Sequence, residues 1–103
     1  SVAPQLHPAD MAEIAARGFR AVICNRPDGE EPGQPSAADI AAAAKAAGLG
    51  FAHVPVRPGE ETQDDAAAMA RALAGLPGPV LGFCRSGNRS ACLAEMARQH
   101  LAD

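Results

Sequence analysis

Residues 79–97 read PVLGFCRSGNRSACLAEMA, and this stretch decides the fold. Residues 79–83 are nearly all apolar, which is typical of a strand covered on both faces of a sheet. Residues 84–89 contain serine and glycine and predict a loop. A helix is expected to begin at Asn88 or Arg89, because apolar residues then recur on one helical face. The stretch therefore predicts a buried strand that leads through a tight loop into a helix.

The rest of the chain also alternates helices and strands. Helices are expected over residues 8–17, 36–47 and 62–74, and strands over 19–24 and 49–56. Two of the helices begin with capping patterns, Ser36 with Asp39 and Thr62 with Asp65. Residues 26–35 contain three prolines and two glycines, and this density predicts a loop.

Strands that are separated by helices pair in parallel through right-handed crossovers. The predicted fold class is therefore α/β, with three layers: a parallel central sheet of about four strands flanked by helices. Residues 1–4 are a candidate for a first edge strand, and Pro55 indicates that the strand at 49–56 lies near the sheet margin. There is no internal repeat or linker, so we expect residues 1–103 to form a single domain.

The composition limits the core. Of the 103 residues 48% are apolar, but 25 of these are alanine, and only 21 are Val, Ile, Leu, Met or Phe. A chain of this size has little surface to bury, and it contains no Trp or Tyr. We therefore expect close helix packing through alanine and a small substrate, since no large ring can wall a deep pocket.

The same composition excludes several classes of protein. No run approaches the roughly 18 apolar residues of a membrane span, and no signal peptide is visible. A net charge of −3 with a single lysine argues against nucleic-acid binding. Three widely spaced cysteines disfavour a disulfide framework or a zinc site and leave room for a reactive thiol. We expect a cytoplasmic protein without metal or cofactor.

Polar residues follow the predicted strands at their carboxyl ends, where open parallel sheets bind ligands. Four of the eight arginines fall there, at positions 26, 57, 85 and 89. Guanidinium groups suit oxyanions. We therefore expect Arg26, Arg57 and Arg85 to bind an anionic substrate, with surface positions as the alternative for each.

Cys84 is the predicted nucleophile. It stands between a strand and a helix N-terminus, where backbone amides and the helix dipole favour a thiolate. Gly87 allows the sharp turn, Arg89 is expected to hold the far oxygens of the substrate, and Ser90 to donate to the thiolate. Ser86 and Asn88 complete the predicted anion-binding loop. The alternative is an inert buried cysteine.

The chain resembles a known family in three segments: AVICNRPDGEEPGQPS at 21–36, FAHVPVRPGEE at 51–61 and GPVLGFCRSGNRSA at 78–91. The family is the beta-lactamase hydrolase-like protein, phosphatase-like domain family, some of whose members are labelled sulfur transferases. CRSGNRS is similar to the loops of rhodanese-type sulfurtransferases and of cysteine-dependent phosphatases. The resemblance implies a cysteine-phosphatase-like fold, and a partner or fused domain such as a persulfide dioxygenase or a flavin oxidoreductase.

Two features depart from the phosphatase pattern that the resemblance brings. Phe83 stands where phosphatases have a histidine, and four residues rather than five separate Cys84 from Arg89. The related phosphatases carry an acidic Asp after the strand that ends here at Val56, whereas this chain continues with Arg57. Other carboxyl groups are candidates for the acid, each with a solvated surface position as the alternative: Asp28, Glu60, Glu61 and Asp64.

These departures favour sulfur transfer as the first hypothesis: Cys84 takes sulfur from a small anionic donor and passes it to a thiol acceptor. The second hypothesis is a cysteine phosphatase that forms a phosphocysteine. The third is a non-catalytic, anion-binding regulatory module of a redox enzyme. Two further cysteines have smaller expected roles. Cys24 is a candidate to resolve an oxidised Cys84 but is expected to be structural, and Cys92 is expected in the helix core.

Overall fold

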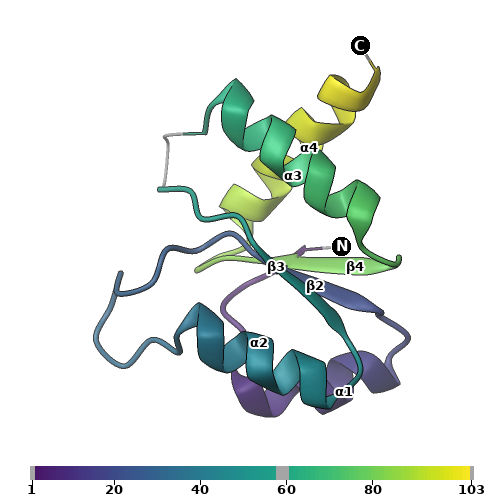
Figure 1. Cartoon of the computed structure of the whole chain (residues 1–103). Coiled ribbons are helices and arrows are strands. Elements are labelled where there is room, and N and C mark those ends of the chain that lie inside the picture. Colours follow the sequence, from purple (N-terminus) through teal and green to yellow (C-terminus); the bar gives the residue numbers. More distant parts are fainter. Residues whose placement is uncertain (1, 58–60, 103) are drawn as a thin grey trace.

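The computed structural model describes the backbone of residues 2–57 and 61–102 and the side chains up to Ala97. The elements follow in the order β1 Val2–Ala3, 3-10 helix η1 Pro8–Asp10, α1 Met11–Ala16, β2 Ala21–Cys24, α2 Ala37–Ala46, β3 Gly50–His53, α3 Gln63–Gly75, β4 Val80–Phe83 and α4 Asn88–Ala102. Their alternation gives three layers, with α1 and α2 on one face of the sheet and α3 and α4 on the other (Figure 1). The predicted α/β class and layering are confirmed.

The four strands form a parallel sheet in the order β1-β4-β2-β3. Residues 2–3 pair with β4, so the expected first edge strand exists. β3 is the other edge strand, as Pro55 predicted. The two central strands, β2 and β4, end side by side, with Cys24 in register with Phe83. This register brings the residues that follow Cys24 and Phe83 to one edge of the sheet.

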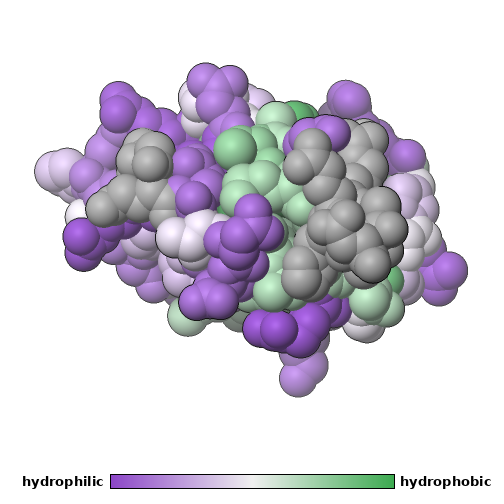
Figure 2. Space-filling view, turned by 90° about the horizontal axis from the view of Figure 1, so that it is seen from above, coloured by the Kyte–Doolittle hydropathy of each residue, from purple (hydrophilic) through white to green (hydrophobic). Residues whose placement is uncertain are grey.

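Two apolar clusters hold the layers together, one on each face of the sheet. Successive residues of β2 point to opposite faces of the sheet and so belong to different clusters. Val22 packs with Met11 and Ile40, and Ile23 packs with Met69 and Leu93. Alanines are buried in both layers, as the composition led us to expect. The outer face of the α3–α4 layer carries an apolar band between hydrophilic margins (Figure 2).

Element ends differ from the predictions by a few residues. The first helix opens with the 3-10 turn η1 at Pro8, a first helical position that needs no backbone amide and so suits proline. β3 ends at His53 rather than Val56, although the amides of Val54 and Val56 still donate to β2 and to the residue after it. Ser36 and Thr62 cap α2 and α3 as predicted. No helix among the described residues is long and apolar enough to cross a membrane.

Candidate active site

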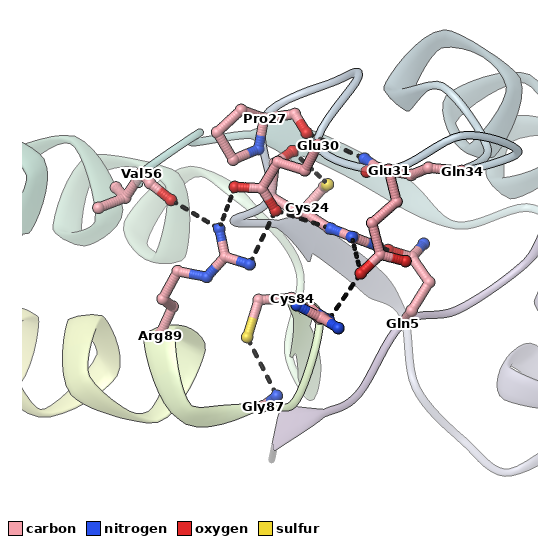
Figure 3. Close-up of polar contacts among 12 residues, drawn as sticks. Gln5, Cys24, Pro27, Glu30, Glu31, Gln34, Val56, Cys84, Gly87 and Arg89 are labelled. Carbon is pink, nitrogen blue, oxygen red and sulfur yellow. Dashed lines mark hydrogen bonds and ion pairs between the residues drawn. The ribbon is translucent and has the colours of Figure 1, made fainter. Parts of the chain in front are cut away.

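The loop between β4 and α4 curls around the sulfur of Cys84. The Gly87 amide donates to Cys84 Sγ at 3.0 Å (Figure 3). Gly87 has φ = 93°, a conformation that side-chain-bearing residues rarely adopt. Its place in the loop is therefore set by backbone geometry, and the residue directs a hydrogen-bond donor at the thiol, as the sequence predicted.

Hydrogen bonds favour the thiolate form of Cys84. Burial opposes ionisation, but the Ser90 amide and hydroxyl and the amides of Ser86 and Gly87 outweigh it, so the pKa of Cys84 lies below the ordinary 9.0. The Ser90 hydroxyl is buried and makes no hydrogen bond of ordinary geometry among the described residues, although its proximity contributes to the lowered pKa of Cys84. Donation from Ser90 to the sulfur stays a prediction.

Cys24 has the opposite environment. Burial raises its pKa to about 11, and its Sγ donates to the Arg26 carbonyl at 3.4 Å. Such a thiol is protonated at neutral pH, which fits the structural role expected for Cys24. Cys92 is exposed on α4 and does not lie in the helix core, so that expectation is wrong. Of the two buried cysteines, Cys84 has the lowered pKa and Cys24 the raised one.

The thiolate of Cys84 should be visible by its ultraviolet absorbance, because the chain has no Trp or Tyr. The difference between wild type and Cys84→Ser is expected to titrate with a midpoint below 9.0, since the loop amides stabilise the anion. Cys24 titrates at higher pH and cancels in the difference. A midpoint at 9.0 or above would show that the loop does not activate the thiol.

Arg89 lies beside Cys84 and is held by a carboxylate that the sequence did not reveal. Its Nη1 and Nη2 donate to the two oxygens of Glu30 at 2.8 and 2.9 Å, and Nη1 also donates to the Val56 carbonyl at 2.9 Å (Figure 3). Burial lowers the pKa of Arg89, but Glu30 and then Cys84 outweigh it and raise the pKa. Glu30 thus holds the guanidinium beside the Cys84 sulfur.

Glu30 also binds a second buried arginine. Its Oε1 accepts from Arg26 Nε at 2.8 Å, and Arg26 is only 2% exposed. The Arg89 hydrogen bonds lower the pKa of Glu30; burial acts against them, and Arg26 adds to them. Glu30 is therefore ionised at neutral pH and serves as an internal anion on the arginines, not as a proton donor. Its only signal in the sequence was its place on the loop that follows β2.

The structure brings three of the four predicted arginines together. Arg26, Arg85 and Arg89 line one cavity of about 250 Å³ with Glu30 and Glu31. Arg57 is exposed and does not belong to this lining. Its neighbour Val56 is buried and its carbonyl accepts from Arg89 Nη1, and adjacent residues of an extended chain face opposite sides, so the Arg57 side chain is exposed.

Three of the four predicted acids, Asp28, Glu61 and Asp64, lie in the described part of the chain and do not line the cavity. Asp28 accepts a hydrogen bond from the Ala37 amide at 2.7 Å and so helps to cap α2. Glu61 is half-buried, Asp64 is exposed in the first turn of α3, and neither lines the cavity. Glu60 lies outside the described residues. No group of three His, Cys, Asp or Glu side chains in the described part of the chain could hold a metal ion.

Comparison with known proteins identifies similar sequences and folds. Residues 1–101 match the family described as beta-lactamase hydrolase-like protein, phosphatase-like domain. Beta-lactamase hydrolase-like proteins of Agrobacterium fabrum and Xylella fastidiosa are 39% and 41% identical to this chain over 93 residues. Each alignment covers 90% of this chain and 22% of the relative, so the chain spans about a fifth of their length.

Solved structures give the same fold. A proposed phosphatase from Neisseria meningitidis has a TM-score of 0.86 and 38% identity, covering 94% of this chain and 69% of that one. Tk-PTP in its active form has a TM-score of 0.58 over 84% of this chain and 56% of its own. At 21% identity the second likeness concerns the fold alone.

Proposed function

Because the chain belongs to the beta-lactamase hydrolase-like protein, phosphatase-like domain family, we propose that it is a cysteine-dependent phosphatase acting on small phosphate monoesters. The observation that carries the proposal is the Cys84 loop, whose amides stabilise a thiolate directly beside the buried Arg89 guanidinium. Sulfur transfer was the first hypothesis from the sequence. The family and the phosphatase-like structural neighbours favour the phosphatase alternative.

The reaction has two displacement steps. The Cys84 thiolate attacks phosphorus, an S–P bond forms, and the P–O bond to the alcohol breaks, with its electron pair leaving on oxygen. Water then attacks phosphorus, the S–P bond breaks, and inorganic phosphate and the thiolate are released, the proton of water passing to solvent. Loop amides and Arg89 stabilise the charge on the transferring group, since fixed donors act most strongly where charge develops.

The state of Glu30 limits the leaving group. The carboxyl group beside Arg89 is ionised, because two arginines hold its pKa low, and it has no proton to give. An alkyl alcohol is a poor leaving group without a general acid, whereas an aryl oxide is already a stable anion. The proposed substrates are therefore aryl phosphates or other esters with stable leaving anions.

We expect kcat/KM for an aryl phosphate such as p-nitrophenyl phosphate to exceed that for glycerol phosphate by at least about 10²-fold, the usual contribution of a general acid. The measurement is initial-rate phosphate release for both esters at neutral pH. Comparable rates would show that a carboxylic acid does reach the leaving oxygen. No release from either ester would contradict the phosphatase proposal.

A second candidate is sulfur transfer, favoured by Phe83 in place of histidine and by the short spacing from Cys84 to Arg89. Here the thiolate attacks the outer sulfur of thiosulfate, a new S–S bond forms, the old one breaks, and sulfite leaves with the electron pair. An acceptor thiolate then removes the sulfur. No step needs a proton donor, which agrees with an ionised Glu30.

The same protein preparation separates the candidates. A gain of one sulfur atom in mass with thiosulfate, lost in Cys84→Ser and without ester hydrolysis, would replace the phosphatase proposal by sulfur transfer. Phosphate binding with neither reaction would instead assign an anion-binding module, whose partner would be a redox enzyme such as a persulfide dioxygenase or a flavin oxidoreductase.

A further inference from the structure

The cavity that Arg89 lines contains two further arginines, Arg26 and Arg85. We propose that these two form a second anion subsite, so that the substrate carries two anionic groups. One group reacts at Cys84, and Arg26 and Arg85 hold the other. The inference rests on the proposed function and names its substrate class.

The first observation is the state of Arg26. Its side chain is only 3% exposed, its Nε donates to Glu30, and its Nη1 donates to Gln5 Oε1 at 2.8 Å. Its Nη2 is buried and has no hydrogen-bond partner among the described residues, although Glu31 Oε1 lies 3.3 Å away as an ion pair. A buried donor without a hydrogen bond is costly, and an anion in the adjoining cavity would satisfy it.

The second observation is that two neighbouring carboxylates, Glu30 and Glu31, already pair with the arginines of the cavity. Glu30 accepts from Arg89 (Figure 3) and from Arg26. Glu31 pairs with Arg26 and with Arg85, whose Nε is 2.7 Å from Glu31 Oε1. Arg26 thus faces both carboxylates. The chain itself places two linked anions across the three arginines, which is the arrangement that a substrate with two anionic groups would reproduce.

The energetics allow such a substrate to displace Glu31. The Arg85 and Glu31 side chains are 70% and 43% exposed, and exposed ion pairs contribute only about 0.2–1 kcal/mol. Arginine forks bind phosphate oxygens by charge-assisted, often bidentate hydrogen bonds. The outer half of the cavity can therefore open at little cost, while the Arg89 half stays buried.

The test compares inorganic phosphate with pyrophosphate by isothermal titration calorimetry on the wild-type chain. Arg85→Gln is expected to weaken pyrophosphate binding about tenfold, as loss of a charge-assisted hydrogen bond would, and phosphate binding much less. Arg17→Gln is the matched control: Arg17 is 71% exposed and also pairs with one glutamate, Glu13 at 3.1 Å, outside this cavity. It should leave both affinities unchanged.

Glu31→Gln supplies the reverse test. Removing the competing carboxylate should strengthen pyrophosphate binding several-fold, and the control Glu13→Gln should not. The second subsite would be overturned if Arg85→Gln weakened phosphate and pyrophosphate binding equally, or if Arg17→Gln weakened pyrophosphate binding as much as Arg85→Gln does. Either result would mean that only the net charge of the protein matters. Failure of the second subsite can be told apart from failure of the proposed function. If only the subsite is wrong, phosphate still binds in calorimetry and aryl phosphate is still hydrolysed. Failure of both ligands to bind would overturn both proposals.

Discussion

Replacing Cys84 by serine is expected to lower kcat for aryl phosphate hydrolysis by at least about 10³-fold. The reason is the ionisation of the nucleophile. The loop amides bring the pKa of the thiol below 9.0, but a serine hydroxyl remains neutral in the same loop. The measurement is steady-state hydrolysis of p-nitrophenyl phosphate at pH values on both sides of neutrality, with circular dichroism to establish that the variant is folded.

Cys92→Ser is the control for this substitution. Cys92 is exposed on α4, and its sulfur lies 3.9 Å from the Met96 sulfur, away from the Cys84 loop. Its replacement should leave the rate within about twofold, as is usual for surface substitutions. Residual activity of Cys84→Ser close to that of the control would remove Cys84 from the mechanism.

Arg89→Lys is expected to reduce kcat/KM by about 10²–10³-fold, the usual cost of losing one preorganised donor to a developing anion. A lysine keeps the charge but lacks the planar fork that holds both Glu30 oxygens and the Val56 carbonyl together. Its ammonium group would follow the Glu30 carboxylate and lose its fixed place beside Cys84. The measurement is kcat and KM on the aryl phosphate, with the urea midpoint as a check of folding.

Arg17→Lys tests whether the effect belongs to the fork. Arg17 donates to Glu13 on the exposed face of α1 and is expected to tolerate lysine without loss of activity or stability. If Arg89→Lys also retained full activity, positive charge alone would suffice, and the bidentate geometry would have no catalytic role.

Much of the site could be predicted because its signals are local. An apolar run before Cys84, a glycine in the loop and a helical pattern after it placed the thiol at a strand end and a helix start. The positive φ of Gly87 and its hydrogen bond to the sulfur follow from that short stretch. Arginine at the same sheet edge indicated an anionic substrate, and Arg26, Arg85 and Arg89 do meet there.

Residues on the long loop could not be predicted in the same way. Residues 26–35 have no helical or strand period, so nothing local indicated where their side chains would point. Asp28 was considered as an acid and instead helps to cap α2, while Glu30, which was not considered, binds Arg89 across 59 positions of sequence. Arg57 was grouped with the other arginines because β3 was expected to run to Val56.

Local patterns in the sequence were enough to predict the α/β order, the parallel sheet and a cysteine loop with arginines nearby. These follow from backbone periods, capping patterns and glycine, all of which act within a few residues. Long-range packing, by contrast, places Glu30 on Arg89 and Glu31 on Arg26 and Arg85, and leaves Arg57 outside the cavity. Buried arginines require counter-charges, and the partner is chosen by the packing of distant segments, because removing such charges from water is costly unless they are paired.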